Sequence, residues 1–180
     1  MDVTLRSPEV GDAEALGDLL RRNRAHFATG QPVRPEGYDS TASQATVIAE
    51  AQRARDNGAA AMFLIETDGR LVGKADLNSV IRGAFQSASV GYLVDEAYTG
   101  RGVATAALRL LVRHAFDALN LHRLQGETLV DNLASQRVLL SCGFVHYGTA
   151  PDYLRLQGRW QTNALYQLIN PAWREPGGTG

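Results

Sequence analysis

The chain has 180 residues, a formal charge of −1 at pH 7, 44% hydrophobic residues and 21% charged residues. This length fits one domain with a sizeable core, and the composition is that of a globular protein rather than a disordered chain. No apolar run approaches the roughly 20 residues that a membrane-spanning helix needs, and the arginines are scattered among acids, which disfavours a nucleic-acid surface. The sequence therefore predicts neither a membrane nor a nucleic acid as a partner.

The N-terminus and the cysteine content indicate a cellular compartment. Residues 1–6 contain no apolar stretch of the kind that secretory signals carry. Cys142 is the single cysteine and cannot form an internal disulfide. We therefore predict a protein of the reducing cytoplasm.

The first third of the chain predicts a short strand followed by two helices. Between residues 12 and 27 the apolar side chains recur at helical spacing, with acids at the start and arginines near the end, as the helix dipole favours. The prolines and glycines that follow indicate a loop. The expected elements are a strand at 3–6, a helix from 12 to about 27, a loop at 29–40 and a helix at 42–56.

The remainder of the chain predicts strands interrupted by two helices. Asp68-Gly69 is a strong two-residue hairpin signal between two of the strands. Gly143 suits the end of the second helix. The expected elements are strands at 61–66, 71–80, 86–94, 123–129, 144–147 and 159–168, a long helix that extends to about 119, and a helix at 132–142.

This order of elements predicts an α/β fold with a central sheet of mixed direction and a single core. Neither an internal repeat nor a linker divides the chain. We expect one domain over residues 1–170 and a C-terminal tail over residues 171–180.

The glycine-rich segment TGRGVAT at 99–105 is the most informative chemical signal. Two glycines let the backbone approach a ligand closely, and the start of the following helix offers free N–H groups and a partial positive charge. The segment therefore suits a pyrophosphate, although a turn without a ligand explains the same pattern equally well. It is neither a Walker A motif, because no Gly-Lys-Ser/Thr follows, nor a dinucleotide fingerprint, because the third glycine is missing.

The start of the next helix carries a second feature. Asn132 is a good N-cap residue, and that structural role is as compatible with the sequence as ligand binding. Ser135 lies one turn further, where its hydroxyl faces either solvent or a cleft.

Together these segments resemble the GNAT acetyltransferases, and within them the RimJ/RimL branch, the N-terminal acetyltransferases of ribosomal proteins. The likeness covers most of the chain. It is carried by Gly91-Tyr92-Leu93-Val94, the segment 100–105, Asn132-x-x-Ser135 and Cys142-Gly143-Phe144. It extends to residues 26–27, 32–34, 78–85, 152–154, 158–161 and 171–173.

The resemblance implies a GNAT fold, with a mostly antiparallel central sheet of about seven strands and four helices. It also implies acetyl-CoA as co-substrate, direct attack of the amine on the thioester, and no metal. The pyrophosphate would lie on the loop that enters the long helix, and the pantetheine along the strand that ends near Leu93 and Val94, where a backbone N–H would polarise the thioester carbonyl. The implied cofactor-binding residues are Leu93, Val94, Gly100, Arg101, Gly102, Val103, Ala104, Thr105, Asn132 and Ser135.

The base follows from the same resemblance. An ammonium must lose a proton before it attacks a thioester. Many GNAT enzymes place a glutamate on the strand that corresponds to 86–94, but this strand has no acid here. The family position that remains is Asp152, against the alternative of a turn residue after Pro151.

The acid and the acceptor site are implied in the same way. Ser135 would protonate the leaving thiolate, with Tyr147 or Tyr153 as the fallback. The branch builds its acceptor cleft from the positions of Arg82, Phe85, Tyr153 and Trp160. Two departures bear on the acceptor: the loop 29–31 lacks a tryptophan that is frequent in the branch, and Thr162-Asn163 replaces an acidic-His pair.

The expected function is therefore acetyl transfer from acetyl-CoA to a primary amine. The first hypothesis is a protein N-terminal α-amine, as in ribosomal-protein-alanine acetylation. The alternatives are a small-molecule amine, such as an antibiotic, a polyamine or an amino-acid-like compound, and a non-catalytic acyl-CoA-binding sensor. Dimers are common in this branch, so a homodimer is also an expected assembly.

Overall fold

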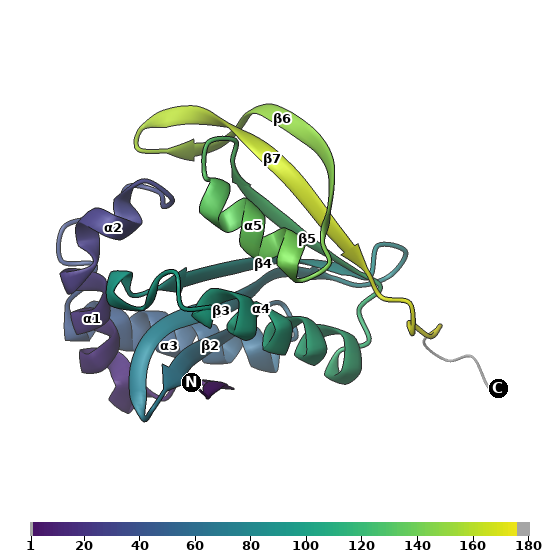
Figure 1. Cartoon of the computed structure of the whole chain (residues 1–180). Coiled ribbons are helices and arrows are strands. Elements are labelled where there is room, and N and C mark those ends of the chain that lie inside the picture. The colour runs from purple at the N-terminus through teal and green to yellow at the C-terminus, as the bar shows by residue number, and fades with distance from the viewer. Residues whose placement is uncertain (1, 176–180) are drawn as a thin grey trace.

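A computed structural model describes residues 2–175, and its central feature is one seven-stranded sheet (Figure 1). Across the sheet the strand order is β1-β2-β3-β4-β5-β7-β6. Neighbouring strands are antiparallel except β4 and β5, which run parallel. The strands are β1 (Val3–Arg6), β2 (Ala61–Thr67), β3 (Arg70–Ile81), β4 (Ser87–Val94), β5 (Arg123–Leu129), β6 (Val145–Leu156) and β7 (Arg159–Ile169). The predicted mixed, mostly antiparallel sheet is confirmed.

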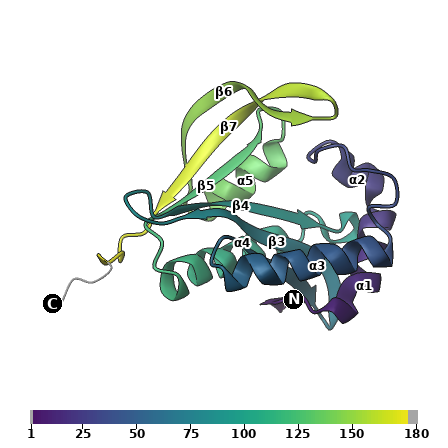
Figure 2. The same ribbon diagram turned by 180° about the vertical axis from the view of Figure 1, so that it is seen from behind.

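Helices cover both faces of the sheet (Figures 1 and 2). One face carries α1 and α3, and the other carries α4 and α5. A short helix, α2, leads from α1 toward the end of the sheet that holds β6 and β7 (Figure 1). The helices are α1 (Ala13–Arg22), α2 (Arg24–Ala28), α3 (Thr41–Asp56), α4 (Val103–Arg113) and α5 (Leu133–Ser141), with 3-10 turns at Val10–Asp12 and Glu96–Tyr98 and a π-helical turn at His114–Ala118.

Alternation along the strands divides the apolar side chains between two core clusters. Ile65 of β2 packs in the cluster that contains Leu108 of α4. Its neighbour Leu64 packs in the other cluster, with Leu16 of α1 and Ile48 of α3. Successive strand residues point to opposite faces, so one strand serves both cores.

A glycine on β5 sets the position of α5. A Cβ atom at Gly126 would lie 2.5 Å from Cδ2 of Leu139, which is buried on α5. The missing side chain therefore lets the helix pack directly on the strand. It also establishes which face of β5 lies under α5, namely the face of Gly126.

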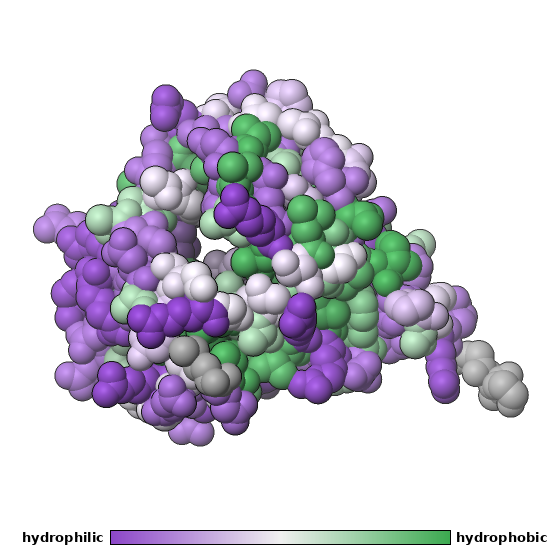
Figure 3. Space-filling model, in the orientation of Figure 1, coloured by the Kyte–Doolittle hydropathy of each residue, from purple (hydrophilic) through white to green (hydrophobic). Residues whose placement is uncertain are grey.

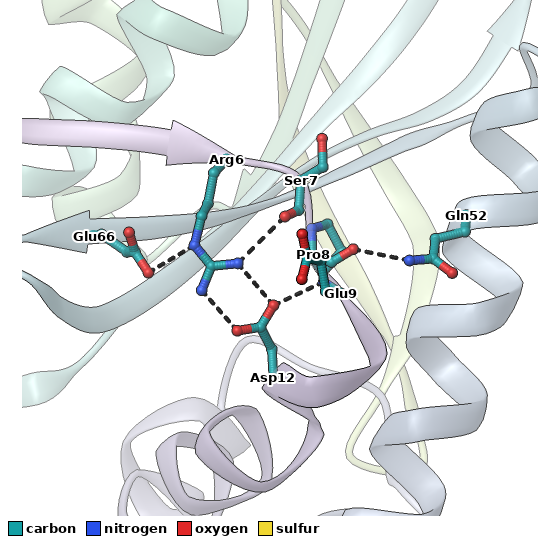
Figure 4. Close-up of polar contacts among 7 residues, drawn as sticks. All are labelled: Arg6, Ser7, Pro8, Glu9, Asp12, Gln52 and Glu66. Atoms are coloured by element: carbon teal, nitrogen blue, oxygen red, sulfur yellow. Dashed lines mark hydrogen bonds and ion pairs between the residues drawn. The ribbon is translucent and has the colours of Figure 1, made fainter.

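Arg6 at the end of β1 ties the N-terminal strand to its surroundings (Figure 4). Its guanidinium donates two hydrogen bonds of 2.7 Å to the carboxylate of Asp12 and one of 2.8 Å to Oε1 of Glu66. The hydrogen bonds from Arg6 hold the pKa of the Asp12 carboxyl below its usual range. Nearby, Nε2 of Gln52 on α3 donates to the carbonyl oxygen of Pro8 at 3.1 Å. These contacts join β1, β2 and α3 on the side of the sheet remote from β6.

The helix predicted over 12–27 is divided at Asn23. Its side chain, which is buried, donates from Nδ2 to the carbonyl oxygen of Leu19 and accepts the backbone N–H of Glu96 on Oδ1, both at 2.9 Å. An asparagine that bonds to nearby backbone competes with helical hydrogen bonding, so α1 ends and α2 starts in a new direction.

β6 is longer than the predicted strand at 144–147, and that prediction was wrong about its end. The strand continues past Gly148 and Pro151 through shifts of register with β7, one of which falls between Ala150 and Leu154. Asp152 lies in this shift with a φ of 49°. Because β6 is the outermost strand, a proline there removes no essential sheet hydrogen bond.

The described part of the predicted tail is held against the domain. The Trp173 ring packs edge-on to His122 at 5.4 Å between ring centroids. Asn120 and the backbone of Arg174 exchange two hydrogen bonds of 2.8 and 3.2 Å. Residues 176–180 of that predicted tail lie outside the described residues.

Candidate active site

The two parallel strands are paired for only part of their length. The register of β4 with β5 ends at Val90 and Gly126, although both strands continue. Beyond that point a cleft of about 850 Å³ opens between them. The surface is visibly hollowed between the part that carries α2 and the part that carries β6 and β7 (Figure 3).

The β4 side of the cleft offers backbone. Gly91, Tyr92, Leu93 and Val94 all line it. Past Val90 the edge of β4 that faces β5 has no partner strand within residues 2–175. An extended ligand can pair with such an edge as an added strand would. The predicted residues Leu93 and Val94 therefore lie where an extended ligand would run.

The glycine-rich loop forms the next part of the same wall. Gly100 and Gly102 have φ angles of 71° and 80°, which favour glycine, and α4 begins directly after Gly102. Within the described chain, no side chain caps the start of α4. Its first N–H groups therefore face the cleft without a side-chain acceptor, which suits an anion.

Five of the six predicted loop residues line the cleft, from Gly100 to Thr105 with the exception of Arg101. The Arg101 guanidinium lies instead over the ring of Tyr98, 5.6 Å from its centroid. The side chain of Arg101 is thus available near the rim, and the loop backbone faces the interior.

The start of α5 differs from the start of α4. Asn132 Oδ1 accepts the backbone N–H of Ser135 at 3.0 Å, so Asn132 is the N-cap. Both residues also line the cleft. The side chain that was open to two interpretations therefore serves the helix.

Ser135 has a tyrosine behind it. Its Oγ lies 2.9 Å from the phenolic oxygen of Tyr92, which also donates to the Ser135 carbonyl oxygen at 3.2 Å. Burial raises the pKa of Tyr92 to about 12, so this phenol keeps its proton at neutral pH. Tyr92 has a single proton: when it donates to the Ser135 carbonyl oxygen it can accept the Ser135 hydroxyl proton, and when it turns to Oγ the serine hydroxyl is free to donate into the cleft.

Glu127 is a cleft residue that the sequence analysis missed. It lines the cleft from β5, and burial raises the pKa of its carboxyl group, with Gln125 and Arg123 opposing the effect. Its Oε2 atom is shielded from solvent and has no hydrogen-bond partner in the described structure. The available signal was an acid inside an otherwise buried strand of alternating pattern.

The residues predicted for the acceptor lie outside this cleft lining. Arg82 donates to the carbonyl oxygen of Leu119 at 2.7 Å. Phe85 and Trp160 are exposed, and so is the predicted base Asp152. The structure does not bring these side chains together with Ser135.

Tyr153 is the predicted acceptor residue that comes nearest to the cleft chemistry. Its hydroxyl accepts a hydrogen bond of 3.0 Å from Gln125, which also accepts one of 2.9 Å from Tyr147. Burial, and then the charge of Glu127, raise the pKa of Tyr153. The two tyrosines therefore connect the outer strand β6 to Gln125 of β5, two residues before Glu127.

The opposite wall of the cleft is made of side chains from distant segments. Phe27 of α2 and Leu154 and Leu156 of β6 line it. Across the mouth, Gln157 in the β6–β7 turn donates to the carbonyl oxygens of Ala28 and Gln31. This bridge joins the α2 region to the hairpin, which approach each other in Figures 1 and 2.

Among residues 2–175, no group of three His, Cys, Asp or Glu side chains is placed to hold a metal ion. No helix in the described chain is long and apolar enough to cross a membrane.

Comparison with known proteins gives full-length relatives. Residues 2–145 match the family described as acetyltransferase (GNAT) domain. A probable N-acetyltransferase of Bacillus subtilis, YjcK, is 36% identical over 94% of both chains. The ribosomal-protein-S5-alanine acetyltransferase from Vibrio fischeri superimposes with a TM-score of 0.92 at 26% identity, over 97% of both chains. Mycobacterium smegmatis RimJ in complex with CoA-disulfide has a TM-score of 0.90 at 30% identity, over 93% of this chain and 81% of that chain.

Proposed function

The chain belongs to the GNAT family of acetyltransferases and is an acetyl-CoA-dependent N-acetyltransferase, and we propose that its acceptor is the α-amine at a protein N-terminus. The observation that carries the proposal is the agreement in fold, over 97% of both chains, with an enzyme named for acetylating an alanine of a ribosomal protein. The M. smegmatis relative, named RimJ, agrees over 93% of this chain. A cytoplasmic location and a homodimer stay predictions.

The acetyl-CoA site follows from the backbone wall of the cleft. We place the pyrophosphate on the N–H groups at the start of α4, where Gly102 leaves the helix without a side-chain cap. The pantetheine would pair with the free edge of β4 at Leu93 and Val94. The solved complex of the M. smegmatis relative with CoA-disulfide supports a CoA site in this fold.

The proposed proton-transfer roles fall on three side chains of this region. Ser135 faces the cleft with Tyr92 behind it, which supports its role as the acid for the leaving thiolate. Asp152 stays the predicted base, although its exposed position on β6 would require a water molecule to relay the proton. Glu127 competes with it for this role.

One observation favours the small-molecule alternative. The hydrogen bonds of Gln157 to the backbone of Ala28 and Gln31 narrow the mouth on the acceptor side. A polypeptide N-terminus needs a wider entrance than a polyamine or an amino-acid-like amine.

The test is thiol release from acetyl-CoA with two panels of acceptors. One contains short peptides with free Ala or Ser N-termini and the same peptides with blocked N-termini. The other contains small amines, including spermidine. We expect turnover on the free peptides that is lost on blocking. Turnover restricted to the small amines would contradict the α-amine proposal.

A further inference from the structure

We propose that Glu127 and Asn163 form the site that receives the acceptor amine, and that Glu127 takes the proton which the ammonium loses before it attacks. The inference rests on the proposed acetyl transfer. It assigns the base to β5, on the floor of the cleft, instead of to Asp152 on the outer strand.

Glu127 lies where β4 and β5 separate. Gly126 is the last β5 residue paired with β4, so Glu127 is the first residue beyond the pairing. If the register continued, its neighbour on β4 would be Gly91, which also lines the cleft and has no side chain. The strand alternation turns Glu127 to the face opposite Gly126, and thus away from α5. The atoms nearest to a Cβ built at Gly91 belong to Asn78, at 3.4 Å, and to Asp76, at 4.0 Å, so these β3 side chains adjoin Gly91 on the face of Glu127.

Asn163 shares this face of the sheet. It is paired with Leu129 on the antiparallel neighbour β7, which places it diagonally from Glu127 and within reach of a long side chain. Asn163 is 1% exposed and lines the same cleft. Together with Thr162, it stands where the family resemblance leads one to expect an acidic-His pair.

The two side chains present unused acceptor atoms. Oε2 of Glu127 and Oδ1 of Asn163 are both shielded from solvent, and neither has a hydrogen-bond partner among the described residues. Buried polar atoms in folded proteins are nearly always paired, so a pair of lone acceptors in one cleft calls for a donor. A primary ammonium supplies three N–H donors and a positive charge, which matches a carboxylate and an amide oxygen.

The arrangement separates the base from the acid. Tyr92 packs against the core cluster under α4 and α5, and its hydroxyl contacts Ser135. Both residues therefore lie on the α5 face of the gap between β4 and β5. Glu127 lies on the other face. A thioester held between β4 and β5 would therefore have Glu127 as a proton acceptor on one side and Ser135 as a proton donor on the other.

The proton balance of the step is complete with these groups. Glu127 accepts one proton from the ammonium, and the free amine nitrogen forms a bond to the thioester carbonyl carbon. The C–S bond then breaks, and the thiolate leaves with the electron pair. The nitrogen passes its second proton to Ser135 Oγ or to water as that group protonates the thiolate, so Ser135 ends as a neutral hydroxyl, and Glu127 releases its own proton to solvent.

The charges around Glu127 leave it able to titrate. Arg123 on β5 favours the carboxylate, whereas burial disfavours it. On β3, Asp76 lies beyond Gly91 in the same row of the sheet, and Lys74 neutralises it at 2.7 Å. The other titratable or charged groups of the cleft lining are His26, Tyr92, Tyr98, Asp131 and Arg137. Those of β6 and β7 are His146, Tyr147, Asp152, Tyr153, Arg155, Arg159 and Tyr166.

The first experiment compares Glu127→Gln and Asp152→Asn with the wild type across pH 5.5–9, using a peptide amide with a free N-terminal alanine and, in parallel, spermidine. We expect Glu127→Gln to lower kcat on the order of 100- to 1,000-fold. It should also abolish the acid limb of the pH profile, which is the fall of kcat/KM as the pH decreases. The Kd for acetyl-CoA should stay within twofold. Glu127→Asp should retain the limb with reduced kcat, and Asn163→Leu should raise the acceptor KM about tenfold.

Glu50→Gln is the matched control. Glu50 is exposed on α3 and does not line the cleft, so this substitution makes the same chemical change away from the site. It should behave as wild type. The inference is overturned if Glu127→Gln keeps kcat within about threefold of wild type with an unchanged acid limb, or if Asp152→Asn removes that limb instead.

A second measurement decides the inference even if no acceptor is turned over, an outcome that would count against the proposed function alone. The Glu127 carboxyl carbon is followed by NMR in protein labelled with ¹³C-glutamate and identified by its absence in Glu127→Gln. With CoA present, we expect its pKa to lie above the ordinary glutamate value and to fall when methylammonium chloride is added. A pKa in the ordinary range that methylammonium does not change would overturn the assignment.

Discussion

The two walls of the cleft are built in different ways. The wall made by β4, the glycine-rich loop and the start of α5 presents mainly backbone, fixed by left-handed glycines and helix starts. The wall made by α2 and the β6–β7 hairpin presents side chains that meet only through tertiary contacts, such as Gln157 with Ala28. A backbone wall suits a co-substrate shared by a family, whereas a side-chain wall can change with the acceptor.

The largest effect in this comparison is expected from Gly102→Val in the backbone wall. A β-branched residue is strained at a φ of 80°, and its Cβ would enter the open space before α4. We expect the Kd for acetyl-CoA, measured by calorimetry, to rise on the order of 10- to 100-fold.

Gly58→Val provides the matched control. Gly58 has a φ of 66° just after α3 and equally open surroundings, but it does not line the cleft. It should lower the Tm as much as Gly102→Val does without changing the affinity for acetyl-CoA. Equal loss of affinity in both variants would mean that strain, and not the phosphate site, explains the result.

The Ser135 and Tyr92 pair is expected to show an intermediate effect. A thiolate is a tolerable leaving group, because a thiol pKa is about 8.5, so Ser135→Ala should lower kcat roughly tenfold rather than abolish turnover. Tyr92→Phe should lower it about threefold, because Tyr92 acts by positioning Ser135 at 2.9 Å. If Tyr92 acts only through the serine, the double variant should equal Ser135→Ala, and additive losses would refute that relation.

The side-chain wall should respond more weakly. Gln157→Ala removes the hydrogen bonds that hold α2 to the hairpin and should widen the mouth. We expect KM for peptide acceptors to fall about two- to threefold, with no change in the Kd for acetyl-CoA. Arg159→Ala is the control, because Arg159 is the exposed first residue of β7 directly after this turn, and it should change neither constant. A change in acetyl-CoA affinity with Gln157→Ala would contradict the division between the walls.

The smallest effect concerns stability and pH. Burial raises the pKa of Glu127 in the folded protein above the unfolded value of about 4.3. Below that unfolded value the group is neutral in both states and carries no penalty, whereas above the folded pKa a partly buried carboxylate destabilises the fold. Glu127→Gln should therefore raise the Tm by roughly 2–4 °C at pH 8 and leave it unchanged near pH 4. A Tm difference that does not depend on pH would contradict this account.

The sequence was most informative where the structure depends on local signals. The TGRGVAT segment predicted an anion site because glycine conformation and a helix start are properties of neighbouring residues. Asn132 is likewise a good N-cap residue by type alone, and in the structure its side chain accepts the backbone N–H of Ser135. The backbone wall was therefore largely predictable.

The part of the cleft around Glu127, and the side-chain wall made by α2 and the β6–β7 hairpin, depend on contacts between distant segments. Glu127 lines the cleft where the β4–β5 pairing has stopped, and β7 brings Asn163 to a position diagonal to it. Asp152 was placed by resemblance, but a shift of register on the edge strand leaves it exposed. The break at Asn23 similarly depends on a hydrogen bond to Glu96, which no local pattern indicates.

Hydrogen–deuterium exchange of the wild-type protein, first with CoA alone and then with an added peptide acceptor, tests the division between the two walls most directly. CoA alone should protect the amides of residues 91–94 and 102–105, and the peptide should add protection at 26–31 and 154–157. Protection of 26–31 and 154–157 by CoA alone, with 102–105 unchanged, would contradict the assignment of the backbone wall to acetyl-CoA.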